Sequence, residues 1–148
     1  MIDVNVYHYF MLHKMFLTKH LERTKQGKKS LLMGTASCIW LGPVRPFVHY
    51  AATKGASGYL STALNFELAR EGLRSDGSNT SLVEMHCSTP FGVGTNLVKS
   101  PHKEHCWKNF TNTTQQYCDS LEANIGQWFY TYGNFYMEIM TILGFKMA

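Results

Sequence analysis

A short apolar run without polar alternation, Ser30–Ala36, constrains the fold of this chain most strongly. Turn-forming residues flank it, which is typical of a strand covered on both faces in a parallel sheet. A second strand is predicted at residues 80–86, and apolar residues at three- and four-residue steps predict helices at 3–24, 49–71 and 113–125. Helices that alternate with strands predict an α/β layer architecture with right-handed crossovers.

Two loops follow the predicted strands, Ser37–Val48 and Ser88–Thr95. Ligands of open α/β sheets gather beyond the carboxyl ends of the strands. We therefore expect both loops to share one rim of the molecule and the chemistry to lie there.

Composition narrows the classes of function. The chain has 148 residues, of which 45% are hydrophobic and 16% charged, so a single domain with a real core is expected and whole-chain disorder is excluded. The net charge of +4 includes no basic stripe with interleaved aromatics, so no nucleic-acid partner is predicted. Residues 128–147 come nearest to a membrane span, but Asn134, Glu138 and Lys146 interrupt them.

The four cysteines form no Cys-x-x-Cys pair, which favours a reducing environment over a disulfide scaffold. His102, His105 and Cys106, with Cys118 as a fourth candidate, suggest a metal site at first sight. They lack a paired Cys-x-x-Cys partner, and structural zinc needs four ligands. A solvated loop is the better interpretation, and no metal is predicted.

Tyr50 and Lys54 are the most specific chemical pair in the chain. Four residues apart on a helix, they lie on one face, one turn apart. A phenol is a poor acid–base catalyst at neutral pH, and a nearby ammonium favours its ionised form, so such a pair suits a general acid. Taken alone, the spacing also fits a surface tyrosine lying over a lysine stem.

Other residues make the pair more specific. Ser37 ends a predicted strand 13 positions before Tyr50, Asp3-Val4-Asn5-Val6 opens the first helix, and Thr89-Pro90-Phe91-Gly92-Val93-Gly94-Thr95 follows the second strand. In this order, the pieces resemble the short-chain dehydrogenase/reductase family, with its catalytic Ser, Tyr-x-x-x-Lys helix, helix-borne Asn and Pro-Gly-x-x-x-Thr loop. Leu21-Glu22-Arg23, the prolines before Tyr50 and the segment 113–135 resemble the branch of 17-beta-hydroxysteroid dehydrogenases and very-long-chain 3-oxoacyl-CoA reductases.

The resemblance implies catalytic roles for Tyr50, Lys54, Ser37 and Asn5. Tyr50 gives a proton to a substrate carbonyl, and Lys54 assists Tyr50 and binds the nicotinamide ribose. Ser37 donates to the carbonyl oxygen, where negative charge develops. Asn5 holds a water that links Lys54 to solvent.

The resemblance also implies a cofactor, a substrate class and partners. The cofactor is NADP(H), with NAD(H) as the alternative, and contacts fall on Tyr50 and Lys54 and on Pro90, Phe91, Gly92, Val93 and Thr95. The substrate is a lipid-like ketone or alcohol, either a 3-oxoacyl-CoA or a steroid. Gly55 and Gly58 in the Tyr50–Lys54 helix suggest close approach of another backbone. Together with Ser57, they form a candidate helix contact, through a homodimer or within the chain. Residues 128–147 suit a substrate cap, a membrane-surface contact, or ordinary core or subunit packing.

The departures from the family pattern define the expected architecture. The chain has no Gly-x-x-x-Gly-x-Gly motif and no Asn-Ala-Gly segment. The resemblance therefore implies that residues 1–148 form a single, partial domain, the catalytic half of a Rossmann-like doubly wound parallel sheet. A fragment, a truncated product or a chain completed by a partner all fit, and the rival function is an inactive remnant that associates with full-length relatives. The branch suggests the endoplasmic-reticulum membrane; without an anchor in the other half, the location would be cytoplasmic.

Overall fold

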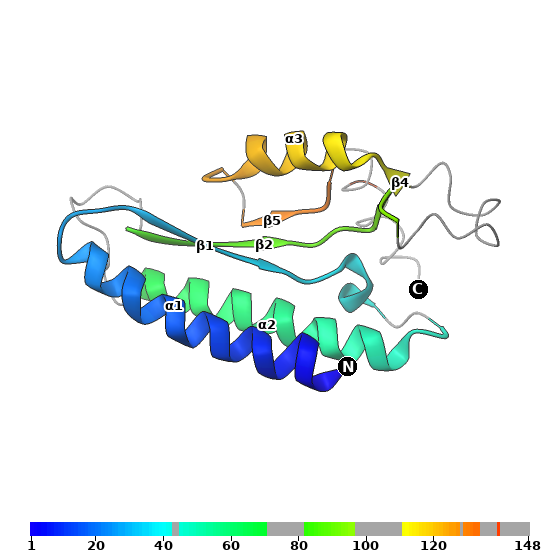
Figure 1. The fold of residues 1–148 in the computed structure, drawn as a ribbon, viewed down its shortest axis with the longest axis horizontal. Coiled ribbons are helices and arrows are strands. Elements are labelled where there is room, and N and C mark those ends of the chain that lie inside the picture. Colours follow the sequence, from blue (N-terminus) through cyan, green and yellow to red (C-terminus); the bar gives the residue numbers. More distant parts are fainter. Residues whose placement is uncertain (43–44, 71–81, 97–110, 128, 134–138, 140–148) are drawn as a thin grey trace.

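A three-stranded parallel sheet with helices on both faces forms the centre of the protein. In the computed structural model, the residues described are 1–42, 45–70, 82–96, 111–127, 129–133 and 139. Strands β1 (Ser30–Thr35), β2 (Val83–Ser88) and β5 (Tyr130–Thr131) lie in the order β1-β2-β5, and all pairings are parallel. Helices α1 (His8–Thr24) and α2 (Val48–Arg70) lie on one face of the sheet, and α3 (Thr114–Asn124) lies on the other (Figure 1).

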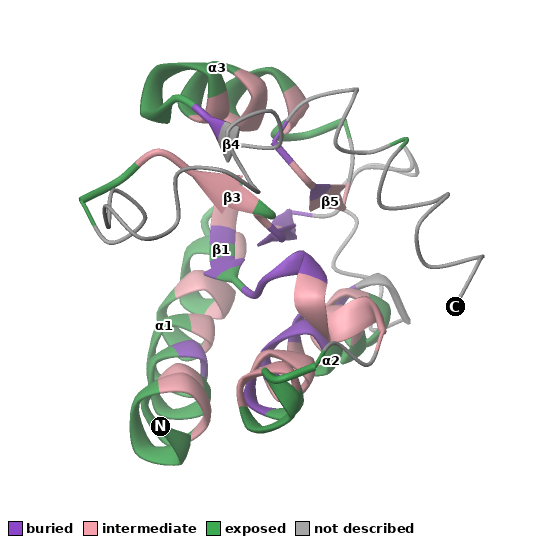
Figure 2. Cartoon of the chain, turned by 90° about the vertical axis from the view of Figure 1, so that its right-hand side faces the viewer, coloured by how far each residue is buried: buried purple, intermediate pink, exposed green. Residues whose placement is uncertain are grey.

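The core lies between the sheet and the helix pair. Leu32, Val83, Met85 and Leu68 are buried together, and partly buried side chains of α1 and of the segment before β5 pack against them. Figure 2 shows the buried segments in the middle of the layers, with exposed residues on the outer sides of the helices. Removing one such side chain from water contributes roughly 1.5–3 kcal/mol, so this cluster fixes how α2 sits on β1 and β2.

The predicted elements are present, with shifted bounds. The first helix begins with a π-helical turn, η1 (Asp3–Tyr7), before α1. The second strand, predicted to end at residue 86, runs to Ser88 because pairing with β1 continues through Gly34 and Thr35. Within the predicted 37–48 loop, Cys38–Leu41 forms a 3-10 helix, η2. The sequence does not predict the short strands β3 (Gly92–Val93) and β4 (Thr111–Asn112), which pair in parallel, nor does it predict β5.

The glycines of α2 correct one expectation. A Cβ at Gly58 would lie 2.7 Å from Cε2 of Trp40, so the close neighbour is an indole ring and not another backbone. A Cβ at Gly55 would meet nothing within 4 Å. Gly58 thus accommodates Trp40 of η2 against α2, whereas Gly55 makes no close approach within the described part of the chain.

A capping box begins α3. The Thr113 hydroxyl accepts a hydrogen bond from the Gln116 backbone N–H, and the Gln116 side chain accepts one from the Thr113 backbone N–H. Replacing Thr113 with alanine is expected to lower the free energy of unfolding by about 1 kcal/mol, measured by urea denaturation. Thr113→Ser keeps the acceptor and should stay near the unaltered value; equal losses in both variants would contradict the cap.

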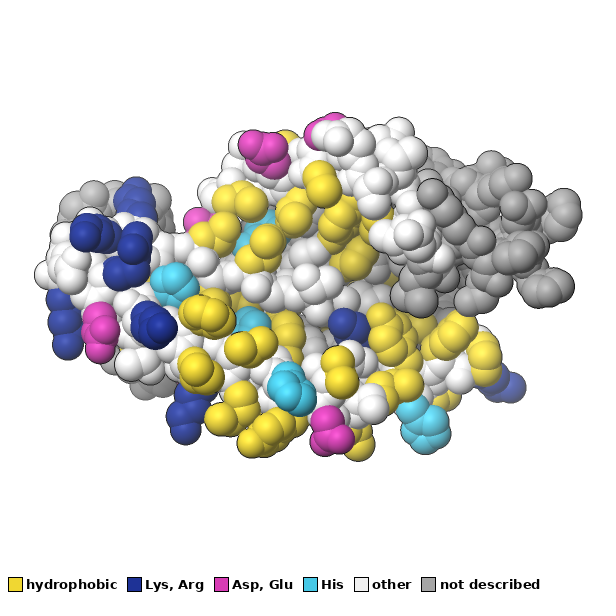
Figure 3. Space-filling view, in the orientation of Figure 1, with side chains coloured by type: hydrophobic (Ala, Val, Ile, Leu, Met, Phe, Trp, Pro, Cys, Tyr) yellow, Lys and Arg dark blue, Asp and Glu magenta, His cyan; other side chains and the backbone are white. Residues whose placement is uncertain are grey.

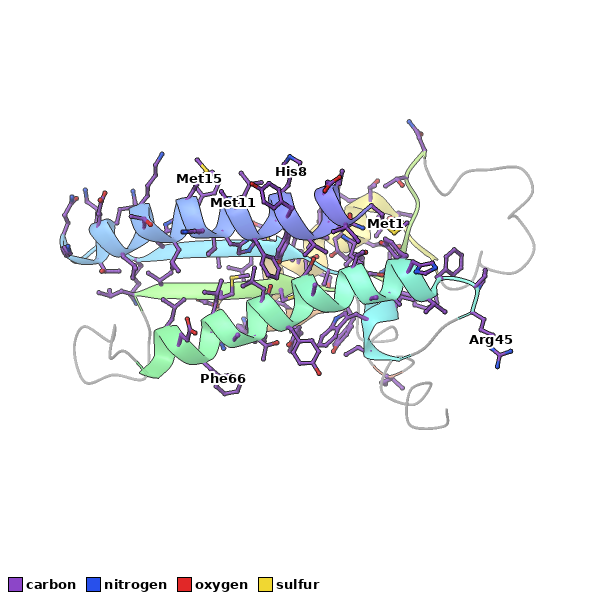
Figure 4. The ribbon with its side chains drawn as sticks, turned by 90° about the horizontal axis from the view of Figure 1, so that it is seen from below. Met1, His8, Met11, Met15, Arg45 and Phe66 are labelled. Carbon is purple, nitrogen blue, oxygen red and sulfur yellow. The ribbon has the colours of Figure 1, made fainter. Side chains whose placement is uncertain are left out.

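One edge of the sheet is open in the described part of the chain. β1 pairs there with β2 and with no other strand. Met33 of β1 is 46% exposed, and Leu12 and Phe16 of α1 are also exposed. Figure 3 shows hydrophobic side chains gathered along α1, and in Figure 4 Met11 and Met15 point from α1 away from α2.

Candidate active site

Two loops meet directly beyond the carboxyl ends of β1 and β2, as the strand order requires. Ser37 follows β1, and its hydroxyl donates to the carbonyl of Pro90 at 3.4 Å. The Cys38 backbone N–H donates to the same carbonyl at 3.1 Å, and the Ala36 N–H donates to Ser88 O at 2.8 Å. Ser37 is buried at this junction. The predicted catalytic serine and the predicted cofactor loop therefore lie side by side.

Tyr50 and Lys54 lie in the first turns of α2. The Lys54 Nζ is 5.9 Å from the centroid of the Tyr50 ring and donates to the carbonyl of Thr35, the last residue of β1, at 3.2 Å. Burial lowers the pKa of Lys54, because a desolvated ammonium is less favourable than a neutral amine. The hydrogen bond to Thr35 places this amine at the strand end, two residues before Ser37.

Asn5 reaches the same helix from η1. Its Nδ2 donates to Thr53 Oγ1 at 3.0 Å, and its backbone carbonyl accepts from the Ser57 hydroxyl at 3.0 Å. Asn5 is thereby fixed beside the turn of α2 that carries Tyr50 and Lys54. In the described part of the chain, the Ser37 hydroxyl bonds to Pro90, and no hydrogen bond joins it to the Tyr50 hydroxyl.

The remaining predicted cofactor residues form the outer part of this rim. Phe91 is 40% exposed, and Gly92 and Val93 form β3. The Thr95 N–H donates to Val93 O at 2.7 Å, which closes a tight turn after β3, and Thr95 is exposed. The loop therefore continues outward from the Ser37–Pro90 junction.

Of the polar residues of α2 that face α1, sequence reasoning identified Ser57 and missed Thr53 and Ser61. Thr53, Ser57 and Ser61 are all buried and recur every four residues, which places them on one helix face. Ser61 Oγ lies 2.9 Å from the Tyr9 hydroxyl. Thr53 and Ser57 contact Asn5. The sequence signal for this polar contact is the recurrence of small hydroxyl side chains every four residues along the helix.

A buried thiol lies behind the site. Cys87 of β2 is fully buried, and burial raises the pKa of its thiol to about 11. The Cys38 pKa is likewise raised by burial, to about 12. Both thiols are therefore neutral at physiological pH and act as packing groups.

Two further expectations concern other regions. His102, His105 and Cys106 lie outside the described residues, and Cys118 is exposed on α3. Among the helices that the structure describes, none combines the length and apolar character needed to cross a bilayer.

Comparison with known proteins gives a structural match. No family model matches the sequence, and no curated protein matches it significantly. A solved structure of 4-hydroxyisoleucine dehydrogenase complexed with NADH is similar, with a TM-score of 0.62 and 18% identity, covering 90% of this chain and 56% of that one. This chain thus spans little more than half the length of that structure. This chain has an incomplete Rossmann-like α/β fold, similar to part of that dehydrogenase, whose structure is complexed with NADH.

Proposed function

We propose that this chain is the catalytic half of an NAD(P)(H)-dependent oxidoreductase of the short-chain dehydrogenase/reductase type, which interconverts a ketone and a secondary alcohol. The proposal is supported by the hydrogen bonds that hold Ser37, Lys54 and Asn5 near the carboxyl end of β1 and the first turns of α2, which carry Tyr50. Ser37 lies at the end of β1, Lys54 donates to Thr35 at the same strand end, and Asn5 is bonded to the turn of α2 between Tyr50 and Lys54. A general acid, a cation and an oxyanion donor are what carbonyl reduction needs.

The chemistry proposed for each residue is the role that the family resemblance implies for it. A bound nicotinamide would supply the hydride. Tyr50 gives its phenolic proton to the carbonyl oxygen, and Ser37 donates a hydrogen bond to that oxygen as charge develops. Lys54, fixed by Thr35, holds a positive charge near the Tyr50 ring, and Asn5 holds a water for proton resupply.

The residues present fit one end of the cofactor. The Lys54 amine, together with the backbone of the loop from Pro90 to Val93 and the Thr95 hydroxyl, suits the nicotinamide ribose and carboxamide. The pyrophosphate needs a glycine-rich turn at a helix N-terminus, and the sequence contains no Gly-x-x-x-Gly-x-Gly. We therefore propose that a second polypeptide, or residues of the same protein beyond this sequence, supplies the pyrophosphate contacts. The proposed cofactor is NADP(H), with NAD(H) as the alternative.

The substrate and partners are proposals of the same kind. We infer a lipid-like ketone, a 3-oxoacyl-CoA or a steroid, because the resemblance to the branch implies this class; the partly exposed ring of Phe91 on the rim suits an apolar substrate. A second copy is proposed to pack on α2, whose exposed face carries Val48, Tyr59 and Phe66. In Figure 4, Phe66 points from α2 away from α1. The open edge of β1 favours one rival, an inactive chain whose role is association with a longer relative.

Cofactor titration tests the proposal. The isolated chain is expected to bind NADH and NADPH more weakly than about 0.1 mM, because the pyrophosphate contacts are absent. Titration monitored by NMR should shift the backbone signals of Ser37, Lys54 and Thr95. Micromolar affinity by fluorescence would contradict the half-site, and shifts confined to other residues would contradict the assigned rim. Lys54→Met is the matched variant and should weaken these shifts.

A further inference from the structure

We propose that Thr53 sets the orientation of the Asn5 carboxamide and is thereby a positioning residue of the active site. The inference rests on the proposed function, because it deepens the role of Asn5. Thr53 is buried, 6% exposed, and lies one residue before Lys54 on α2.

Counting hydrogens at Thr53 fixes the direction of its bonds. A hydroxyl has one hydrogen and two acceptor sites, and the Thr53 hydroxyl donates its hydrogen to the Tyr50 carbonyl at 2.8 Å. It can therefore only accept from Asn5, whose Nδ2 lies 3.0 Å away. The two ends of a carboxamide are otherwise assigned from their surroundings. Here the hydroxyl requires the NH₂ group to face Thr53 and the Oδ1 atom to face away from it.

Ser57 holds the backbone of Asn5. Its hydroxyl donates to the Asn5 backbone carbonyl at 3.0 Å and lies 3.4 Å from the Thr53 carbonyl. Asn5 is thus held by side chains one helical turn apart on α2. The backbone of Asn5 belongs to the π-helical turn η1, and single π-helical turns occur frequently at functional sites.

The chemical consequence concerns the free oxygen of the carboxamide. With NH₂ bound to Thr53, Oδ1 remains an acceptor for the water that the proposed mechanism places between Asn5 and Lys54. Without the Thr53 hydroxyl, the carboxamide NH₂ group loses its acceptor and the carboxamide can rotate by about 180°. The NH₂ group would then face the water in place of Oδ1. Thr53 touches neither substrate nor cofactor in this account, and it acts through Asn5.

NMR of the ¹⁵N-labelled chain tests the orientation. The Asn5 side-chain amide signals, identified by their loss in Asn5→Asp, should move toward free-amide positions in Thr53→Val. Their exchange with water should rise about tenfold, the factor that corresponds to one lost hydrogen bond. Thr53→Ser should restore both values. Thr18→Val is the matched control, because the Thr18 hydroxyl also donates within its own helix, to Lys14 O at 3.2 Å.

Two further measurements keep the result decisive. In the unaltered chain, a nuclear Overhauser effect should join the Asn5 amide hydrogens to the Thr53 methyl group, so a valine variant that fails to fold leaves the contact testable. Absence of this nuclear Overhauser effect, or unchanged Asn5 amide signals in a folded Thr53→Val chain, would overturn the proposal. In an active assembled enzyme, Thr53→Val should lower kcat at unchanged KM, with rescue by serine; an unchanged kcat would also overturn it. An inactive unaltered enzyme contradicts the proposed function alone, since the amide signals still decide the role of Thr53.

Discussion

Replacing Tyr50 with phenylalanine in an assembled enzyme is expected to lower kcat by about 10²–10⁴-fold, the usual contribution of a positioned general acid. The substitution removes only the phenolic oxygen. The ring beside Lys54 Nζ and the Lys54 bond to Thr35 remain, so the cofactor contact that we propose for Lys54 should be preserved. Cofactor affinity should therefore change little while turnover is lost. Steady-state kinetics and cofactor titration measure the two effects separately.

The same helix offers a matched control. Tyr59 is 71% exposed and lies more than two turns after Tyr50, so Tyr59→Phe removes an identical atom on the face proposed for a second copy and outside the catalytic rim. It should leave kcat within about twofold, since surface substitutions have small effects. Full turnover in Tyr50→Phe would remove Tyr50 as the acid. An equal loss in both variants would mean that the effect comes from the helix and not from the reaction.

Gly34→Ala is expected to lower the free energy of unfolding by about 1–3 kcal/mol, the range for overpacking a filled core. A Cβ at Gly34 would overlap the Tyr9 hydroxyl and lie 3.0 Å from His13 Nε2. The Tyr9 side chain is held at two points. Its ring stacks on His13 with the ring centroids 4.1 Å apart, and its hydroxyl lies 2.9 Å from Ser61 Oγ. Relief of the overlap would require movement of α1 or loss of the Tyr9–Ser61 hydrogen bond.

Gly55→Ala makes the same chemical change with the opposite expected sign. Gly55 lies inside α2, and an added methyl group there would meet no atom of the described residues within 4 Å, so alanine should stabilise the helix by about 1 kcal/mol. Urea denaturation of the two variants gives both values. A neutral or stabilising Gly34→Ala would show that Tyr9 does not pack against β1 in solution.

Local patterns predicted those parts of the site that neighbouring residues determine. The four-residue step placed Tyr50 and Lys54 on one helix face, and the unbroken apolar run placed Ser37 at a strand end. The contact between Asn5 and Thr53 joins residues 48 positions apart, and no local pattern encodes such a pairing. For the same reason Trp40, which determines the need for Gly58, was not identified from the sequence.

Strand bounds were predictable only where an unbroken apolar run was long enough to mark them. β5 has two residues, Tyr130 and Thr131, too few for any alternation to be detected. It exists because the Cys87 and Thr89 backbone N–H groups donate to Phe129 O and Thr131 O, each at 2.8 Å. The extension of β2 to Ser88 likewise depends on pairing with β1 rather than on local apolar character.

In the described part of the chain, one side of β1 pairs with no strand, so a polypeptide that adds a strand there would stabilise the fold by mass action. A polypeptide that adds a strand along residues 30–35 binds the folded state alone, because the unfolded chain offers no such edge. Its contribution to stability then grows with the logarithm of its concentration above its dissociation constant. The melting temperature should therefore rise in a titration with any polypeptide that pairs along β1.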